Sequence, residues 1–137
     1  MIILEENSLE IEARALSALA NPRRLEILEL LRDGEACVCH IQAVLGQRQA
    51  LISQHLNVLR QAGLVTSRKD GLRVYYQVSS RRWFAVVDEL GRALHEQGLL
   101  PVAPAVDLEK RGQPHCTCPQ CSERWMEQVE VQEVRRS

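Results

Sequence analysis

The chain has 137 residues, of which 45% are hydrophobic and 26% charged, and its formal net charge is −1. This length and balance favour one globular domain with a tail, and they argue against a disordered, fibrous or two-domain protein. No apolar run approaches the roughly 18 residues of a membrane span, and the start lacks the pattern of an export signal. We therefore expect a cytoplasmic protein whose five cysteines serve metal or redox chemistry rather than disulfides.

The middle of the chain is strongly basic. Residues 41–82 contain seven Lys and Arg residues against the single acid Asp70, whereas the segments on either side are acidic on balance. A local excess of positive charge inside a nearly neutral chain is typical of a surface that contacts phosphates. From charge alone, a solvated basic face is an equally simple interpretation.

Three helices are predicted in the first third of the chain. The first covers residues 8–20 with Ser8 as its cap, because apolar residues recur there at helical spacing: Leu9, Ala13, Leu16 and Ala20. Pro22 suits the first position of a second helix, with Asn21 as its cap. A short third helix is expected over residues 40–45.

A longer helix and a hairpin follow. Residues 49–62 have a polar side without acids and an apolar side that is expected to face inward: Leu51, Ile52, Leu56 and Leu59. Two alternating runs, 65–69 and 73–78, are joined through Asp70 and Gly71. An Asp-Gly pair between such runs is the strongest short signal for a β-hairpin.

The last predicted helix of the domain begins near residue 80. Its apolar stripe is larger than a small core needs, so part of it is expected to pack against a second subunit: Trp83, Val87, Leu90 and Leu94. Prolines then interrupt the chain. The sequence thus predicts a DNA-binding and dimerisation domain over residues 1–100, and a linker with a cysteine-rich tail over residues 101–137.

This order of elements describes a mainly α (α+β) fold, a winged helix-turn-helix with a two-stranded wing. A helix fits the DNA major groove, where amide and hydroxyl side chains meet base edges, while a basic wing holds phosphates. The residues expected to contact DNA are Gln49, Ser53, Gln54 and His55 on the helix, and Arg68, Lys69 and Arg73 on the wing. His55 as a packing residue is the alternative.

Three segments resemble the ArsR/SmtB family of metal- and metalloid-responsive repressors: LGQRQALISQHLNVLRQAGLV at 45–65, DGLRVYY at 70–76 and ALANPRRL at 18–25. The resemblance covers roughly residues 8–98. It implies a homodimer formed through the terminal helices of the domain, which binds double-stranded operator DNA and releases it when an ion binds.

Two cysteines lie just before, or at the start of, the short helix expected over residues 40–45, which precedes the helix expected to contact DNA. Cys37 and Cys39 are two residues apart, a spacing that separates side chains by about 200° within a regular helix but can converge at an irregular helix start. A helix N-terminus also favours the thiolate, which is the metal-binding form. Buried structural cysteines are the alternative.

The resemblance sharpens this prediction, because arsenic- and cadmium-sensing members carry a Cys-Val-Cys-Asp stretch at this position. Here His40 replaces the aspartate, Gln42 stands where arsenic sensors have a third cysteine, and residues 1–36 contain no cysteine. The family's zinc site on the last core helix is disfavoured, because only Asp88 and His95 are present.

The tail supplies further thiols in a Cys-x-Cys-x-x-Cys cluster next to His115: Cys116, Cys118 and Cys121. Three thiolates at this spacing are a strong signal for a soft ion, although an inert tail or a separate metal site is also open. His40 and His115 are weaker candidate ligands.

The leading hypothesis is therefore a repressor without enzymatic activity, released from DNA by As(III) or Sb(III) bound to these cysteines. Cadmium, lead or zinc is the alternative effector, and a thiol redox or persulfide switch on the same fold is the alternative mechanism. No permanent cofactor is expected.

Overall fold

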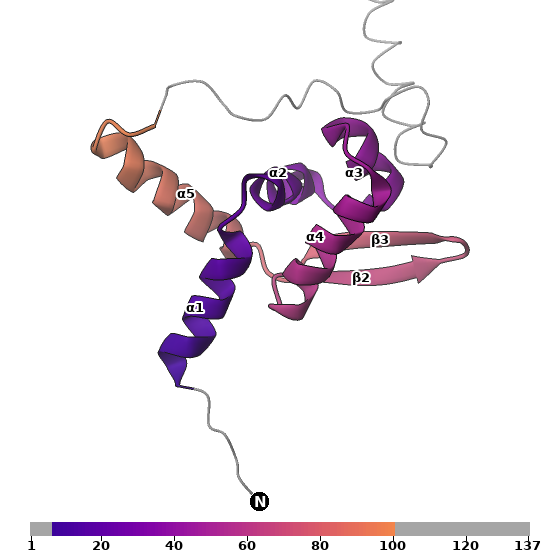
Figure 1. Ribbon diagram of the computed structural model, residues 1–137, viewed down its shortest axis with the longest axis horizontal. Coiled ribbons are helices and arrows are strands. Elements are labelled where there is room, and N and C mark those ends of the chain that lie inside the picture. Colours follow the sequence, from indigo (N-terminus) through magenta and orange to yellow (C-terminus); the bar gives the residue numbers. More distant parts are fainter. Residues whose placement is uncertain (1–6, 101–137) are drawn as a thin grey trace, which may run out of the picture.

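The computed structural model describes residues 7–100, in which helices surround one end of a small sheet and a β-hairpin projects away from them (Figure 1). In chain order, the elements are α1 (Ser8–Leu19), α2 (Pro22–Leu30), the 3-10 helix η1 (Leu31–Asp33), β1 (Ala36–Cys37), α3 (Val38–Leu45), α4 (Gln49–Gln61), β2 (Val65–Asp70), β3 (Arg73–Val78) and α5 (Arg82–Glu96). The sheet is antiparallel, with strand order β1-β3-β2. Within the described residues, every helix is too short or too polar to cross a bilayer. The winged helix-turn-helix prediction is confirmed.

The first two helices begin at asparagine caps. The Asn7 side chain accepts a backbone hydrogen bond at 3.0 Å, and Glu10 accepts one from the Asn7 backbone at 3.1 Å, which completes a capping box. The prediction of Ser8 as the cap is therefore wrong by one residue. Asn21 caps α2 with Pro22 in the first position, as predicted, because proline needs no hydrogen-bond partner for its nitrogen there.

A tight turn separates the two helices of the helix-turn-helix unit. Gly46 ends α3 with φ of 63°, a left-handed conformation in which a side chain would be strained. Helix α3 begins at Val38, two residues earlier than predicted. Cys37 is consequently its N-cap, and Cys39 lies in its first turn.

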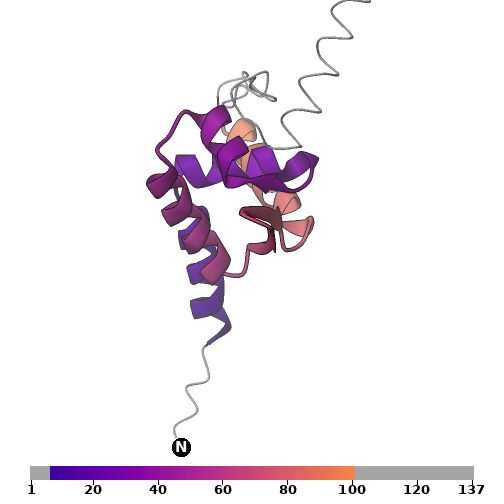
Figure 2. The same ribbon diagram turned by 90° about the vertical axis from the view of Figure 1, so that its right-hand side faces the viewer.

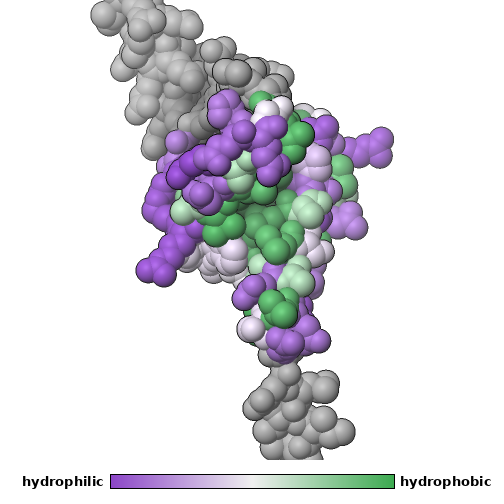
Figure 3. Space-filling model, turned by 90° about the vertical axis from the view of Figure 1, so that its left-hand side faces the viewer, coloured by the Kyte–Doolittle hydropathy of each residue, from purple (hydrophilic) through white to green (hydrophobic). Residues whose placement is uncertain are grey.

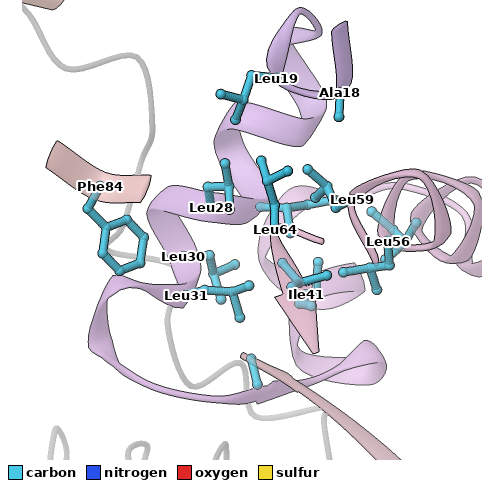
Figure 4. Packing of buried hydrophobic residues seen from close by; sticks show 14 of the residues in the cluster. Ala18, Leu19, Leu28, Leu30, Leu31, Ile41, Leu56, Leu59, Leu64 and Phe84 are labelled. Atoms are coloured by element: carbon cyan, nitrogen blue, oxygen red, sulfur yellow. The ribbon is translucent and has the colours of Figure 1, made fainter. Parts of the chain in front are cut away.

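One apolar core joins α2, α3, α4 and the start of β2 (Figure 4). Its fully buried side chains are Ile27, Leu28, Leu30, Leu31, Ile41, Ile52, Leu56, Leu59, Leu64 and Val65. Phe84 extends the core toward α5. Leu51 was expected to face inward, but it is 36% exposed, because its neighbour Ile52 takes the core position one helical step away.

The strand β1 was not predicted from the sequence. Its two residues pair with Tyr76 and Tyr75 of β3, and two residues are too few for a visible alternation of apolar and polar side chains. Through this pairing, the wing hairpin is hydrogen-bonded to the segment that leads into α3.

The terminal helices α1 and α5 lie on the side of the domain opposite the hairpin (Figure 1). Viewed from that side, apolar side chains gather at the surface (Figure 3). The large apolar residues exposed on these two helices are Leu9, Ile11, Leu16, Val86 and Leu90. Helix α1 also runs beside α4, with which it is in contact (Figure 2).

Candidate nucleic-acid interface and sensing segment

The exposed side of α4 carries three of the predicted DNA-contacting residues. Gln49, Ser53 and Gln54 are all exposed, and the inward side of the helix is occupied by core residues. Further along, Arg60 donates a 2.8 Å hydrogen bond to Asn57 on the same exposed side. These residues form a polar surface without a carboxylate, which matches the donors and acceptors of base edges.

His55 lies differently from the other three. Its residue is 9% exposed, and its Nδ1 is 3.5 Å from Nη1 of Arg24 on α2. Burial lowers the pKa of His55 below its usual 6.5, and the charges of Arg24 and Arg23 lower it further. A ring held in this way packs α4 against α2. This matches the alternative interpretation of the sequence, in which His55 is a packing residue.

Arg24 links three helices, a role the sequence did not reveal. Its Nε donates to the carbonyl of Ala18 at 2.5 Å and its Nη2 to the carbonyl of Ser17 at 3.2 Å, both near the C-terminal end of α1. A cation at this end satisfies carbonyls that the helix itself leaves open. With its contact to His55, Arg24 therefore sets α1 against α4. The only sequence signal was its place in the family-like ALANPRRL segment.

The wing tip is a two-residue turn between Asp70 and Arg73, with Gly71 at φ of 60°. Lys69 is exposed beside it, and Arg73 is half-buried at the start of β3. Leu72 is fully exposed at the tip, a position that sequence analysis did not single out. The predicted basic wing is therefore present, and the Lys69 side chain places a solvent-exposed positive charge near its tip.

Arg68 points across the sheet. Its Nε donates to Oε2 of Glu35 at 2.7 Å and its Nη2 donates to Oε1. Its guanidinium carbon also lies 4.6 Å from the centroid of the Tyr75 ring. The hydrogen bond from Arg68 lowers the pKa of Glu35. Nothing in the sequence indicated Glu35, because an ion pair over such a distance along the chain leaves no local pattern.

Cys37 and Cys39, the predicted ligands in the described part of the chain, have different surroundings. Cys37 is 1% exposed, and its sulfur accepts a hydrogen bond from the His40 backbone at 3.3 Å, which caps α3. Cys39 is exposed in the first turn of α3. His40 is fully buried. One thiol is thus open to an incoming reagent, while the other is packed inside.

Within residues 7–100, no group of three or more His, Cys, Asp and Glu side chains could hold a metal ion. Asp88 of the disfavoured zinc site instead pairs with Arg32. The predicted ligands Cys116, Cys118 and Cys121, with His115, lie outside the described residues, as does the predicted tail segment 101–137. A metal site at Cys37 and Cys39 would therefore need a further ligand from outside the described part of the chain or from another molecule.

Comparison with known proteins gives a consistent picture for the helix-turn-helix region. Residues 21–67 match the family model described as "Bacterial regulatory protein, arsR family". The chain is 43% identical over 77 residues to the transcriptional activator HlyU of Vibrio cholerae, covering 56% of this chain and 71% of HlyU. It is 42% identical over 83 residues to the arsenical resistance operon repressor of Escherichia coli K12, covering 58% and 71%.

A solved structure shows the same fold. It is the homodimeric winged helix-turn-helix DNA-binding domain of a possible ArsR-family transcriptional regulator from Mycobacterium bovis. It superposes with a TM-score of 0.59 at 34% identity, covering 70% of this chain and 95% of that one. The matched proteins include both a transcriptional activator and an operon repressor.

Proposed function

The chain belongs to the ArsR family of bacterial regulatory proteins, and from this premise we propose that it is a transcriptional repressor of operator DNA, released by a thiophilic ion. The observation that carries the DNA-binding part is the exposed, acid-free side of α4 beside the basic wing. In the proposed complex, Gln49, Ser53 and Gln54 face base edges. Lys69 and Arg73 contact phosphates, and His55 holds α4 in place.

The functional unit of the proposal is a homodimer formed through α1 and α5. Support comes from the large apolar residues that both helices expose on one side of the domain, since such a patch marks an interaction surface. A two-fold dimer presents two copies of α4 to successive major grooves, about 34 Å apart. The operator is accordingly a palindrome.

The effector in the proposal is As(III) or Sb(III), with cadmium, lead or zinc as alternatives. Exposed Cys39 binds first, and Cys37 follows when the start of α3 opens. A cysteine of the tail, Cys116, Cys118 or Cys121, completes three-fold sulfur coordination. With arsenous acid, each thiol replaces one hydroxide and releases one water. The ion shifts the dimer away from DNA only if it binds the DNA-free conformation more tightly.

The test uses a fluorescent duplex selected by the wild-type protein from a random pool. Arsenite, cadmium and zinc are titrated into the complex while anisotropy reports release. The variant Cys37→Ser/Cys39→Ser should stay bound, because serine still caps α3 but supplies no thiolate. The variant Cys116→Ser/Cys118→Ser/Cys121→Ser should lose most of the response. Normal release of the first variant would overturn the assignment of the sensing segment, and normal release of the second would remove the tail from the switch.

A thiol redox or persulfide switch is the second candidate, and it is favoured by the exposure of Cys39, which peroxide or polysulfide can reach. In the redox form, peroxide oxidises two thiols to one disulfide, and its oxygens leave as two waters. Mass spectrometry after peroxide or polysulfide treatment, beside metal analysis of protein purified under reducing conditions, distinguishes the candidates. A mass loss of two hydrogens with DNA release, and no response to any ion, would favour the redox switch.

A further inference from the structure

Three side chains from three strands form one row across the sheet. Cys37 of β1 is the register partner of Tyr75 on β3, and Tyr75 is the register partner of Arg68 on β2. Directly opposite residues of antiparallel strands project from the same face. The sensing cysteine, the tyrosine and the wing arginine therefore lie side by side on one face of the sheet.

The row is tightly packed at its β1 end. Cys37 and Tyr75 form a small buried cluster of their own, with Ala43 of α3 packed against it, apart from the main core. Cys37 is 1% exposed and Tyr75 is 6% exposed. Interiors of this density leave no room for an added atom, so a group bound to the Cys37 sulfur has to displace its neighbours.

The row is closed at its other end by an ion pair. The Arg68 side chain passes over the Tyr75 ring and reaches Glu35, two residues before Cys37. We call the Arg68–Glu35 ion pair with the stacked Tyr75 ring the Arg68 bridge. It connects the wing to the short segment 35–37 that carries the sensing thiol.

We propose that the Arg68 bridge transmits the state of Cys37 to the wing. A ligand or modification at the Cys37 sulfur moves Tyr75 and the segment 35–37, which separates Arg68 from Glu35 and changes the position of the hairpin relative to α4. Since both α4 and the wing have to meet the same duplex, a displaced hairpin weakens binding. The inference rests on the proposed function, in that Cys37 is the sensing thiol.

The first experiment compares Glu35→Gln with its matched control Glu89→Gln. Both changes remove one carboxylate from an ion pair with an arginine, but the Glu89 pair with Arg92 is exposed on α5, which lies on the side of the domain opposite the hairpin. The readout is the ratio of duplex affinities without and with arsenite. We expect this ratio to fall at least about five-fold in Glu35→Gln and to be retained in Glu89→Gln.

The second pair of variants tests the ring. Tyr75→Phe keeps the aromatic face over which Arg68 lies and should retain the arsenite response, whereas Tyr75→Leu removes it and should lose the response. If Tyr75→Leu does not fold, the comparison of Glu35→Gln with Glu89→Gln decides alone. A wild-type ratio in Glu35→Gln, with arsenite releasing the wild-type protein, would overturn the bridge and leave the proposed function intact.

A third readout needs no effector. Cys37 is 1% exposed, so its alkylation requires the segment 35–37 to open, and a duplex that binds the closed arrangement more tightly should lower the population of the open one. In a chain with Cys39, Cys116, Cys118 and Cys121 changed to serine, the rate of Cys37 alkylation by iodoacetamide is measured with and without the duplex. We expect DNA to alter the rate, and Glu35→Gln to abolish the difference. The Arg68 bridge is refuted if DNA leaves the alkylation rate unchanged, or if DNA changes it equally in the wild type and in Glu35→Gln. This result holds independently of the effector, because the measurement uses no ion.

Discussion

Arg32 of η1 donates to both carboxylate oxygens of Asp88 on α5, 56 residues further along the chain. The same guanidinium also donates to both carboxylate oxygens of Glu29, and its central carbon lies 4.9 Å from the centroid of the Phe84 ring. The Arg32 side chain therefore reinforces the attachment of α5 to the body of the domain that buried Phe84 provides. Since η1 is followed closely by β1, the attachment lies near Cys37 along the chain.

Replacing Asp88 by Asn should loosen this attachment. We expect the free energy of unfolding to fall by about 0.5–1 kcal/mol, a modest loss because Asp88 is half-exposed and water screens the pair. Urea denaturation at a fixed protein concentration measures the change. Glu89→Gln, which breaks an exposed pair on the same helix, should shift the midpoint less, and equal shifts would contradict a special role for Arg32.

Stability should depend on pH through His55. Its pKa in the folded protein is below 6.5, so the unfolded chain takes up a proton first as the pH falls through 6.5. The contribution of neutral His55 is therefore complete above about pH 6.5 and is lost progressively from there down to its folded pKa. Urea midpoints measured between pH 7.5 and 5.5 should fall less in His55→Gln than in the wild type, and an equal fall in the two proteins would contradict this role of His55.

Gln54→Ala tests the base-reading side of α4. Because a bidentate amide contact discriminates between bases by about 1–3 kcal/mol, the variant should lose that preference at one operator position in each half-site. Competition with duplexes that vary one base pair at a time measures it. Gln97→Ala, a change of the same type at the exposed C-cap of α5, is the control and should leave the base preference unaltered.

Lys69→Gln tests the wing. Loss of a phosphate contact should weaken binding to every duplex alike, and the slope of log affinity against log salt should decrease by about one for each subunit. Anisotropy titrations over a range of salt concentrations give the slope. An unchanged slope, or a loss confined to one sequence, would argue against a phosphate contact at this residue.

Leu90→Glu tests the dimer surface. Leu90 is 54% exposed on the apolar side of α5, so a buried charge there should raise the dimer dissociation constant at least about tenfold. Ala85→Glu places the same charge on the polar stripe that contains Glu89 and Arg92, and it should leave the dimer intact. Sedimentation equilibrium separates the two outcomes; equal behaviour of both variants would exclude this face of α5.

The five α-helices, the helix-turn-helix and the wing could be predicted from the sequence, because they depend on local signals: Asn21 before Pro22, Gly46 and Gly71 at turns, and apolar spacing along α4. The sequence also identified the exposed polar residues of α4. The folded structure was needed to show that His55 packs against Arg24, that β1 joins the sheet, and that Arg68 pairs with Glu35. Each of these features is a contact between residues that are distant in sequence and come together only when the chain folds. Such contacts produce no local or periodic pattern in the sequence.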